Sequence, residues 1–321
     1  MRILVTGGAG FIGSHLVEAL LHDERVTLVR VLDNLSTGSV DNIEQFHNHP
    51  NFEFAKGDIR DYSFCLQACT DVNLISHQAA LGSVPRSIND PLTINDVNIS
   101  GTLNIFHAAK EKRIKRVVYA ASSSTYGDHP GLPKVESVIG KPLSPYAVTK
   151  YVNELYADVF ARIYEMQLIG LRYFNVFGPK QSPNGPYAAV IPIFVRAILN
   201  NEPPTINGDG NNSRDFTYVA NAVEANLLGM FTKNHQAVNQ VYNIAVGSQT
   251  SLNDLFQMIK EIAGSDLSPF YGPERAGDVK HSLADISKAK QLLGYHPNID
   301  IKRGLKETFE WYRQRHHFAY S

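Results

Sequence analysis

The chain has few of the residues that cross-link or anchor specialised proteins. It contains two cysteines among 321 residues, Cys65 and Cys69, which is too few for a disulfide framework. They lie four positions apart on a predicted helix, which favours two buried free thiols in a reducing compartment over a redox pair. No apolar run approaches the roughly 20 residues of a membrane-spanning helix, so we expect no contact with a membrane.

Strong charge and metal-ligand motifs are also lacking. The formal net charge of −1 argues against a general nucleic-acid surface, although local basic clefts stay open. The twelve histidines form no His-Glu-x-x-His pattern or Cys/His ligand set, so we expect no metal site. The first apolar run begins at Arg2, which leads us to expect no secretory signal and a cytoplasmic protein.

What the sequence does contain is a regular alternation of strand and helix patterns. With 43% hydrophobic residues the chain can bury a large core, as one domain plus a smaller one. The predicted strands cover 2–6, 27–32, 52–56, 73–77, 115–120 and 168–174, and the predicted helices cover 11–22, 61–69, 92–112 and 145–167. This alternation predicts an α/β fold, a Rossmann-type doubly wound parallel sheet with helices on both faces.

The second half of the chain is less regular. Helices are expected near 188–200 and over 218–232, with a strand at 241–246. Ser251 and Asp254 have capping-box spacing, which predicts another helix start. We therefore expect a first domain over 1–175 and a smaller C-terminal α/β domain over 176–321, with a return of 216–246 to the first domain left open.

A glycine-rich turn follows the first predicted strand. Gly7, Gly8, Gly10 and Gly13 separate this strand from a helical pattern, as in the dinucleotide-binding fingerprint. Glycines there allow the tight turn, while the helix N-terminus offers N–H groups to a pyrophosphate. Asp33 lies twenty residues beyond Gly13, where a carboxylate accepts hydrogen bonds from ribose hydroxyls. Because no Lys or Arg follows in 34–38, the sequence favours NAD over NADP.

Tyr146 and Lys150 are spaced for one face of a predicted helix. Residues four apart in a helix are neighbours, and an ammonium beside a phenol favours the phenolate. We therefore expect Lys150 to lower the pKa of Tyr146, which would let this tyrosine exchange protons near neutral pH. A Tyr-x-x-x-Lys pattern alone is most often an ordinary helix surface, so its weight comes from the other motifs.

Ser122 ends a predicted strand and completes the series. Open α/β sheets bind ligands beyond the carboxyl ends of their strands. The glycine turn, Asp33, Ser122 and Tyr146-x-x-x-Lys150, in that order, resemble the extended short-chain dehydrogenase/reductases. Within these, the segments 122–127, 171–178, 207–216 and 275–278 resemble the UDP-galactose 4-epimerase family over essentially the whole chain.

The resemblance implies roles for specific residues. It implies a homodimer built from helices 92–112 and 145–167, NAD binding by residues 1–175 and UDP-sugar binding by residues 176–321. The implied catalytic residues are Ser122, Tyr146 and Lys150. The implied NAD contacts are Gly7, Gly10, Phe11, Ile12, Gly13, Asp33, Asn34, Ser36, Thr37, Gly38, Asp58, Ile59, Gln78, Ala79, Ala80, Asn98, Tyr146, Lys150 and Phe174. The implied substrate contacts are Gly82, Ser83, Ser122, Ser123, Ser124, Tyr146, Asn175, Ala189, Val190, Arg214, Arg275, Asp278 and Ser282.

The implied reaction is NAD-dependent 4-epimerisation of a UDP-sugar through a transient 4-keto sugar. Related dehydratases carry an Asp-Glu pair where this chain has Ser123 and Ser124, and related decarboxylases keep a Glu there, so simple epimerisation is favoured. Ser282 replaces a bulky tyrosine of some epimerases, which leaves room for an N-acetyl group. Segment 81–87 also resembles bacterial UDP-N-acetylglucosamine 4-epimerases of surface-polysaccharide pathways.

We therefore expect UDP-GlcNAc and UDP-GalNAc as substrates, with UDP-Glc and UDP-Gal as a further option. The uronic-acid forms stay open as an alternative, because Arg86 or Ser83 could meet a carboxylate. A catalytically silent NAD-binding sensor or scaffold is the alternative of another class.

Overall fold

The centre of the molecule is a parallel sheet of seven strands. The computed structural model describes residues 1–184, 188–274 and 280–318. The strand order is β11-β6-β5-β4-β1-β2-β3, and every neighbouring pair is parallel. The strands are β1 (Arg2–Thr6), β2 (Leu28–Asp33), β3 (Phe52–Lys56), β4 (Leu74–His77), β5 (Arg116–Ser122), β6 (Gln167–Tyr173) and β11 (Gln240–Ile244). The predicted Rossmann-type fold is confirmed, and chain order reverses between β1 and β4, which creates a crevice for a ligand.

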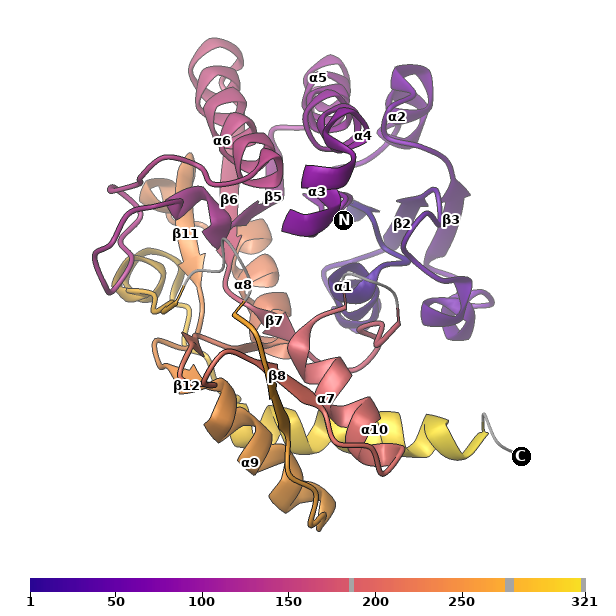
Figure 1. The fold of residues 1–321 in the computed structure, drawn as a ribbon. Coiled ribbons are helices and arrows are strands. Elements are labelled where there is room, and N and C mark those ends of the chain that lie inside the picture. The colour runs from indigo at the N-terminus through magenta and orange to yellow at the C-terminus, as the bar shows by residue number, and fades with distance from the viewer. Residues whose placement is uncertain (185–187, 275–279, 319–321) are drawn as a thin grey trace.

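Helices cover both faces of this sheet (Figure 1). One layer contains α2 (Tyr62–Ala68), α5 (Gly101–Glu111) and α6 (Pro145–Tyr164), and the other contains α1 (Phe11–Leu21) and α8 (Val219–Phe231). The sequence missed the short α3 (Val84–Asn89). The predicted helix 92–112 is a run of α4 (Pro91–Asn95), one π-helical turn and α5.

The predicted end of helix 145–167 is wrong by three residues. The helix stops at Tyr164, because Glu165 adopts a left-handed backbone conformation with φ of 53°. The chain then reverses at once, and Gln167 begins β6. The apolar pattern that runs through this corner belongs partly to the helix and partly to the strand, which is why periodicity placed the boundary too late.

A second, smaller group of elements lies beyond the carboxyl ends of the strands. Its helices are α7 (Val190–Leu199), α9 (Leu252–Ala263) and α10 (Ile301–Phe318), of which the sequence did not predict α10. Three short strand pairs join it: β7 (Val176–Phe177) with β10 (Thr217–Tyr218), β9 (Ser213–Arg214) with β12 (Thr250–Ser251), and β8 (Thr205–Asn207) with β13 (Phe270–Gly272). Ser251 accepts a hydrogen bond from the Asp254 amide at 3.0 Å, so the predicted helix start is confirmed. The domain boundary at 175 stays a prediction, although β11 does lie beside β6 in the large sheet.

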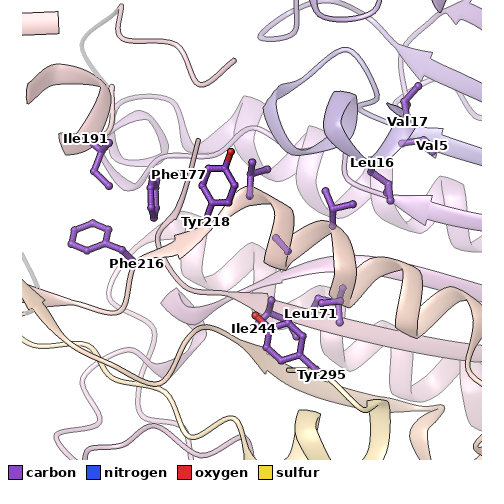
Figure 2. Packing of buried hydrophobic residues seen from close by; sticks show 14 of the residues in the cluster. Val5, Leu16, Val17, Leu171, Phe177, Ile191, Phe216, Tyr218, Ile244 and Tyr295 are labelled. Atoms are coloured by element: carbon purple, nitrogen blue, oxygen red, sulfur yellow. The ribbon is translucent and has the colours of Figure 1, made fainter. Parts of the chain in front are cut away.

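One large hydrophobic cluster joins the two groups of elements. Figure 2 shows it extending from the packing of α1 on β1 to the residues that begin α7 and β10. Its labelled members are Val5, Leu16, Val17, Leu171, Phe177, Ile191, Phe216, Tyr218, Ile244 and Tyr295. Because these side chains pack without a break, the second group is held against the ends of the strands.

A second cluster lies beneath α2, α5 and α6 and contains both cysteines. Cys65 and Cys69 are fully buried and free, as predicted, and burial raises the pKa of each thiol to about 12. In the described part of the chain, no helix combines the length and apolarity needed to cross a bilayer.

Candidate active site

The glycine turn is shaped by contacts that leave no space for a side chain. Gly7 has a φ of +69°, which favours glycine. A Cβ added at Gly13 would lie 2.1 Å from the Gly7 carbonyl oxygen, so α1 can approach the turn only if this position is glycine. Gly10 precedes α1 and provides no side-chain cap. The N-terminus of α1 therefore offers its N–H groups and the positive end of its dipole to a ligand.

Asp33 fixes this turn to the end of β2. Its carboxylate accepts hydrogen bonds from the Ala9 amide at 2.9 Å and from the Leu35 amide at 2.8 Å. Burial raises the pKa of Asp33, and both backbone bonds oppose that effect. The side chain lies in the crevice with further acceptor capacity, as recognition of a ribose diol requires.

The turn and the predicted catalytic residues line one cleft of about 400 Å³. The cleft follows the carboxyl ends of the parallel strands, where the sequence placed it. The predicted NAD contacts that line it are Gly7, Gly10, Phe11, Ile12, Gly13, Asp33, Asn34, Ser36, Thr37, Ile59, Gln78, Ala79, Ala80, Tyr146 and Lys150.

Four predicted NAD contacts lie behind the lining. Asn98 is fully buried and holds the loop after β4 by bonds to the Leu81 backbone, at 2.8 Å to the amide and 3.1 Å to the carbonyl. Phe174 is fully buried, with its ring 6.0 Å from that of Tyr126. Gly38 packs on the Ala9 backbone. These three support the cleft wall and do not face its space.

Asp58, the fourth, is engaged with neighbouring side chains. It pairs with Arg60 at 2.8 Å and accepts a hydrogen bond from the Asn34 amide group at 2.8 Å. The hydrogen bond from Arg60 is the main reason that the pKa of Asp58 falls to about 2. Asp58 therefore stays ionised and orients Asn34, which does line the cleft.

Ser122, Tyr146 and Lys150 meet at the other end of the cleft. Ser144 caps α6 by accepting a hydrogen bond from the Ala147 amide at 3.2 Å, and Pro145 begins the helix. This start sets the helix rotation that turns Tyr146 and Lys150 toward the end of β5. The Lys150 ammonium donates to the Ala120 carbonyl at 2.8 Å and lies 6.0 Å from the centroid of the Tyr146 ring.

The predicted lowering of the Tyr146 pKa by Lys150 is wrong for the protein in this structure. Burial raises the pKa of Tyr146, and a hydrogen bond with Ser122 opposes the rise. Burial lowers the pKa of Lys150 to about 8, against the charge of Glu154, which raises it. The sequence argument considered helix spacing alone, whereas the structure adds the cost of removing both groups from water and an amine that is engaged with Ala120.

The Ser122 hydroxyl is held by the turn that follows β5. Its oxygen accepts hydrogen bonds from the Ser124 amide at 3.2 Å and from the Ser124 hydroxyl at 2.8 Å. Its own proton is then free to be donated, and Tyr146 is the partner. Ser124 thus acts on the site through Ser122, and Ser123 lies in the same turn.

The predicted substrate contacts fall into two groups. Gly82, Ser122, Tyr146 and Asn175 line the cleft. Ser83 caps α3, while Ala189 and Val190 begin α7. Arg275 and Asp278 lie outside the described residues.

Arg214 and Ser282 lie together, because both donate to the same backbone carbonyl. Arg214 donates to the Ser213 carbonyl at 2.9 Å and to the Lys280 carbonyl at 3.1 Å. The Ser282 amide donates to the same Ser213 carbonyl at 3.0 Å. Asn175 is connected to this strand, because its side-chain amide donates to the Asp215 carbonyl at 3.4 Å.

Sequence reasoning missed Tyr173, Val176 and Gln181, which also line the cleft. The signal for Tyr173 was present, since it ends a strand whose carboxyl end faces the crevice. Gln181 follows an irregular turn, where no pattern predicts side-chain direction. Within the described residues, no group of three His, Cys, Asp or Glu side chains could hold a metal ion.

Residues 3–245 match the family model described as the NAD dependent epimerase/dehydratase family. The chain belongs to this family. Its relatives include a protein named as a putative UDP-glucose 4-epimerase from Methanocaldococcus jannaschii, 40% identical over 96% of this chain and 97% of that protein. A UDP-N-acetylglucosamine 4-epimerase from Methanobrevibacter ruminantium, solved with UDP-N-acetylmuramic acid, is 43% identical with a TM-score of 0.92, covering 98% of both chains.

NAD is the cofactor of this family member, and the residues present fit it. A UDP-glucose 4-epimerase from Thermus thermophilus, solved with NAD, has a TM-score of 0.87 and 34% identity over 98% of this chain and 99% of that one. In the present chain the glycine turn can hold the pyrophosphate, because Gly13 lets α1 approach the turn where any side chain would clash with the Gly7 carbonyl. Asp33 supplies the carboxylate, and the lining residues Asn34, Ser36 and Thr37 carry no cation for a 2′-phosphate.

Proposed function

We propose that this enzyme interconverts the C4 epimers of a UDP-sugar, with UDP-GlcNAc and UDP-GalNAc as its substrates. The observation that carries the proposal is one cleft that joins the glycine turn and Asp33 to Ser122, Tyr146 and Lys150. A phenol, a hydroxyl donor and a buried ammonium at the sugar end suit removal of a proton from a sugar hydroxyl. A sensor or scaffold would have no use for this arrangement.

Bound NAD supplies the hydride acceptor and a positive charge. Tyr146 takes the proton of the 4-hydroxyl group and later returns one to the 4-keto sugar. The Ser122 proton stabilises the phenolate between these events, because the other hydrogen bonds of its oxygen are accepted from Ser124. Lys150 has a pKa of about 8, so its amine carries a positive charge near the phenol at pH values below 8.

Epimerisation is favoured over dehydration or decarboxylation by the turn beyond β5. The positions next to the Ser122 hydroxyl carry Ser123 and Ser124, whose side chains have no basic form near neutral pH. Loss of water or carbon dioxide requires an additional acid or base at the sugar. The site therefore has groups for proton exchange at one carbon only.

The choice of an N-acetylated sugar rests on Ser282. Its amide and the Arg214 side chain share the Ser213 carbonyl, on the strand that we assign to the nucleotide diphosphate, and a serine is small enough to admit an acetyl group at this position. The M. ruminantium relative supports this choice and the M. jannaschii relative supports the smaller UDP-Glc and UDP-Gal, which would also fit. The uronic-acid forms are the second candidate, because Arg86 lies in the first turn of α3, where its amide donates to the Ser83 hydroxyl at 3.3 Å, and Ser83 follows Gly82 of the cleft lining.

Product analysis by NMR tests the function and the sugar together. The wild-type enzyme, without added cofactor, should interconvert UDP-GlcNAc and UDP-GalNAc faster than UDP-Glc or UDP-GlcNAc uronate. Tyr146→Phe should lose about 10²-fold or more in kcat, because it lacks the proton carrier. Ser282→Tyr should lose turnover of the N-acetylated pair while it keeps the plain pair, because the added ring fills the space of the acetyl group.

Each alternative has its own outcome in this experiment. A chain that retains NAD and converts none of the sugars is a sensor or scaffold. Preferred turnover of the uronate, lost in Arg86→Ala, would assign the acidic sugars. An unchanged sugar preference in Ser282→Tyr would remove the basis for the N-acetyl assignment.

We also propose that the chain forms a homodimer through α4 and α6. Five aliphatic side chains on these two helices are more than a third exposed, and α4 packs against α6. They are Leu92, Val148, Leu155, Val159 and Ile163. A continuous apolar face of this kind usually marks a protein interface.

A further inference from the structure

Three side chains form a closed ring of hydrogen bonds at the wall of the cleft. The Tyr173 hydroxyl donates to the Gln78 carbonyl at 3.0 Å and accepts from the Asn226 amide nitrogen at 2.7 Å. The Gln78 amide nitrogen donates to the Asn226 carbonyl at 2.9 Å. Tyr173 and Gln78 line the cleft, whereas Asn226 is fully buried on α8. None of the roles assigned above uses Tyr173 or Asn226.

A backbone carbonyl fixes the donor and acceptor direction of the whole ring. Asn226 donates at 2.8 Å to the Ala222 carbonyl, which can only accept. The nitrogen of Asn226 must therefore lie on that side, and its oxygen must face Gln78. Gln78 then has to present its own nitrogen to Asn226, which leaves its oxygen toward the Tyr173 hydroxyl.

Ser76 strengthens the same arrangement. It is fully buried, accepts from the Gln78 amide nitrogen at 2.9 Å and donates to the Asn226 carbonyl at 3.3 Å. The two N–H groups of Gln78 are thus both used. One of the two lone pairs on the Gln78 carbonyl is used by Tyr173, so this carbonyl keeps one acceptor site at the cleft wall.

The ring lies at the catalytic end of the cleft. Tyr173 on β6 is the register partner of Ser122 on β5, so the two residues lie side by side on adjacent strands. Gln78 directly follows β4, and β4 is the other neighbour of β5 in the sheet. The nicotinamide ring of NAD must lie near Ser122 and Tyr146 if the proposed function holds. The nicotinamide carries a carboxamide, whose N–H group needs an acceptor when it is buried.

We propose that Gln78 accepts a hydrogen bond from the carboxamide of NAD, and that Asn226 is the positioning residue that holds Gln78 in the accepting orientation. The inference rests on the proposed function for the placement of the nicotinamide ring. An epimerase needs this placement to be rigid, because the keto sugar must rotate in the site while the nicotinamide stays fixed. The hydrogen-bonded side chains, whose donor and acceptor direction is set by a backbone carbonyl, supply that rigidity without a charged group.

Binding of two probes to the full-length protein tests the proposal. NADH carries the carboxamide, whereas ADP-ribose has the same adenosine, diphosphate and ribose without it. Gln78→Met and Asn226→Asp should weaken NADH binding by about fivefold or more, the effect of one lost hydrogen bond, and leave ADP-ribose within about twofold. The fluorescence maximum of bound NADH should shift in both variants, because its carboxamide is less constrained.

Tyr242→Phe is the matched control. It removes a buried tyrosine hydroxyl that donates to the Ala237 carbonyl at 2.8 Å, on β11 and away from the cleft lining. It should lower the melting temperature and leave both ligands unaffected. If Asn226→Asp does not fold, Asn226→Ser replaces it, with the same selective loss of NADH, because it removes the carbonyl that holds the Gln78 amide nitrogen.

Two results would overturn the proposal. Equal weakening of NADH and ADP-ribose would make the ring a purely structural support, and unchanged binding of NADH in Gln78→Met would mean that the carbonyl is not an acceptor. Failure of the proposed function gives a different pattern. In that case the wild-type protein converts no UDP-sugar, while the NADH and ADP-ribose comparison still gives its own answer.

Discussion

At the scale of the single residue, Asp215 makes the stability of the fold depend on pH. Its carboxylate is fully buried and accepts hydrogen bonds from the amides of Val246 and Gly247, each at 3.0 Å. Burial still raises its pKa from 3.8 to about 6, because these bonds only partly replace water. Between these two pH values Asp215 is protonated in the folded state and ionised in the unfolded state. Its contribution to the free energy of unfolding is therefore fully present below about pH 4 and is lost as the pH rises through 6.

We expect Asp215→Asn to flatten this part of the pH profile. A shift of about two pKa units corresponds to about 3 kcal/mol. The free energy of unfolding of the wild type should fall by this amount, relative to the variant, as the pH rises through 6. Urea unfolding at several values between pH 4 and pH 7 measures it. Parallel wild-type and variant curves would contradict the assignment.

At the scale of the element, the contact between α1 and the glycine turn connects stability to cofactor binding. Gly13→Ala places a methyl group 2.1 Å from the Gly7 carbonyl, so α1 must move away from β1. We expect a loss of about 2 kcal/mol in stability and a large loss of NAD affinity, because the N–H groups of α1 no longer reach the pyrophosphate. Thermal unfolding and NADH titration measure the two effects.

Gly82→Ala is the control for that substitution. It also lies at the cleft, but an added Cβ there meets nothing within 4 Å. Its melting temperature should equal that of the wild type. An equal drop in both variants would mean that the clash at Gly7 is not the cause.

At the scale of the whole molecule, the dimer that we propose depends on the exposed apolar side chains of α4 and α6. Ile163 on α6 is 63% exposed and Leu92 on α4 is 83% exposed, which is unusual for side chains of this size. We expect sedimentation velocity to show a dimer for the wild type and a monomer for Ile163→Glu. Leu132→Glu is the control, since Leu132 is 42% exposed in the segment between β5 and α6 and should leave the dimer intact. A monomeric wild type would remove this interface.

The sequence predicted most of the sheet and the two ends of the cleft. The strand before Gly7, the helix that carries Tyr146 and Lys150, and the pair Ser251 and Asp254 are patterns of a few residues, so they can be recognised without tertiary information. The position of β11 at the sheet edge stayed open, because no local pattern says which strand a distant segment will join. α10 was not predicted, although Leu305, Phe309 and Tyr312 have helical spacing and are buried where α10 packs on α7 and α9.

The sequence by itself determined where a nucleotide could bind, because glycine spacing, a strand end and a helix start are local features. The expectation that Ser122, Tyr146 and Lys150 share a crevice came from the family resemblance, since no local pattern brings distant segments together. Only the tertiary structure decided in which direction the pKa values of Tyr146 and Lys150 shift, and how Asn226 orients Gln78. The physical reason is that desolvation and hydrogen-bond polarity depend on every segment packed around a group, and these segments come together only in the folded chain.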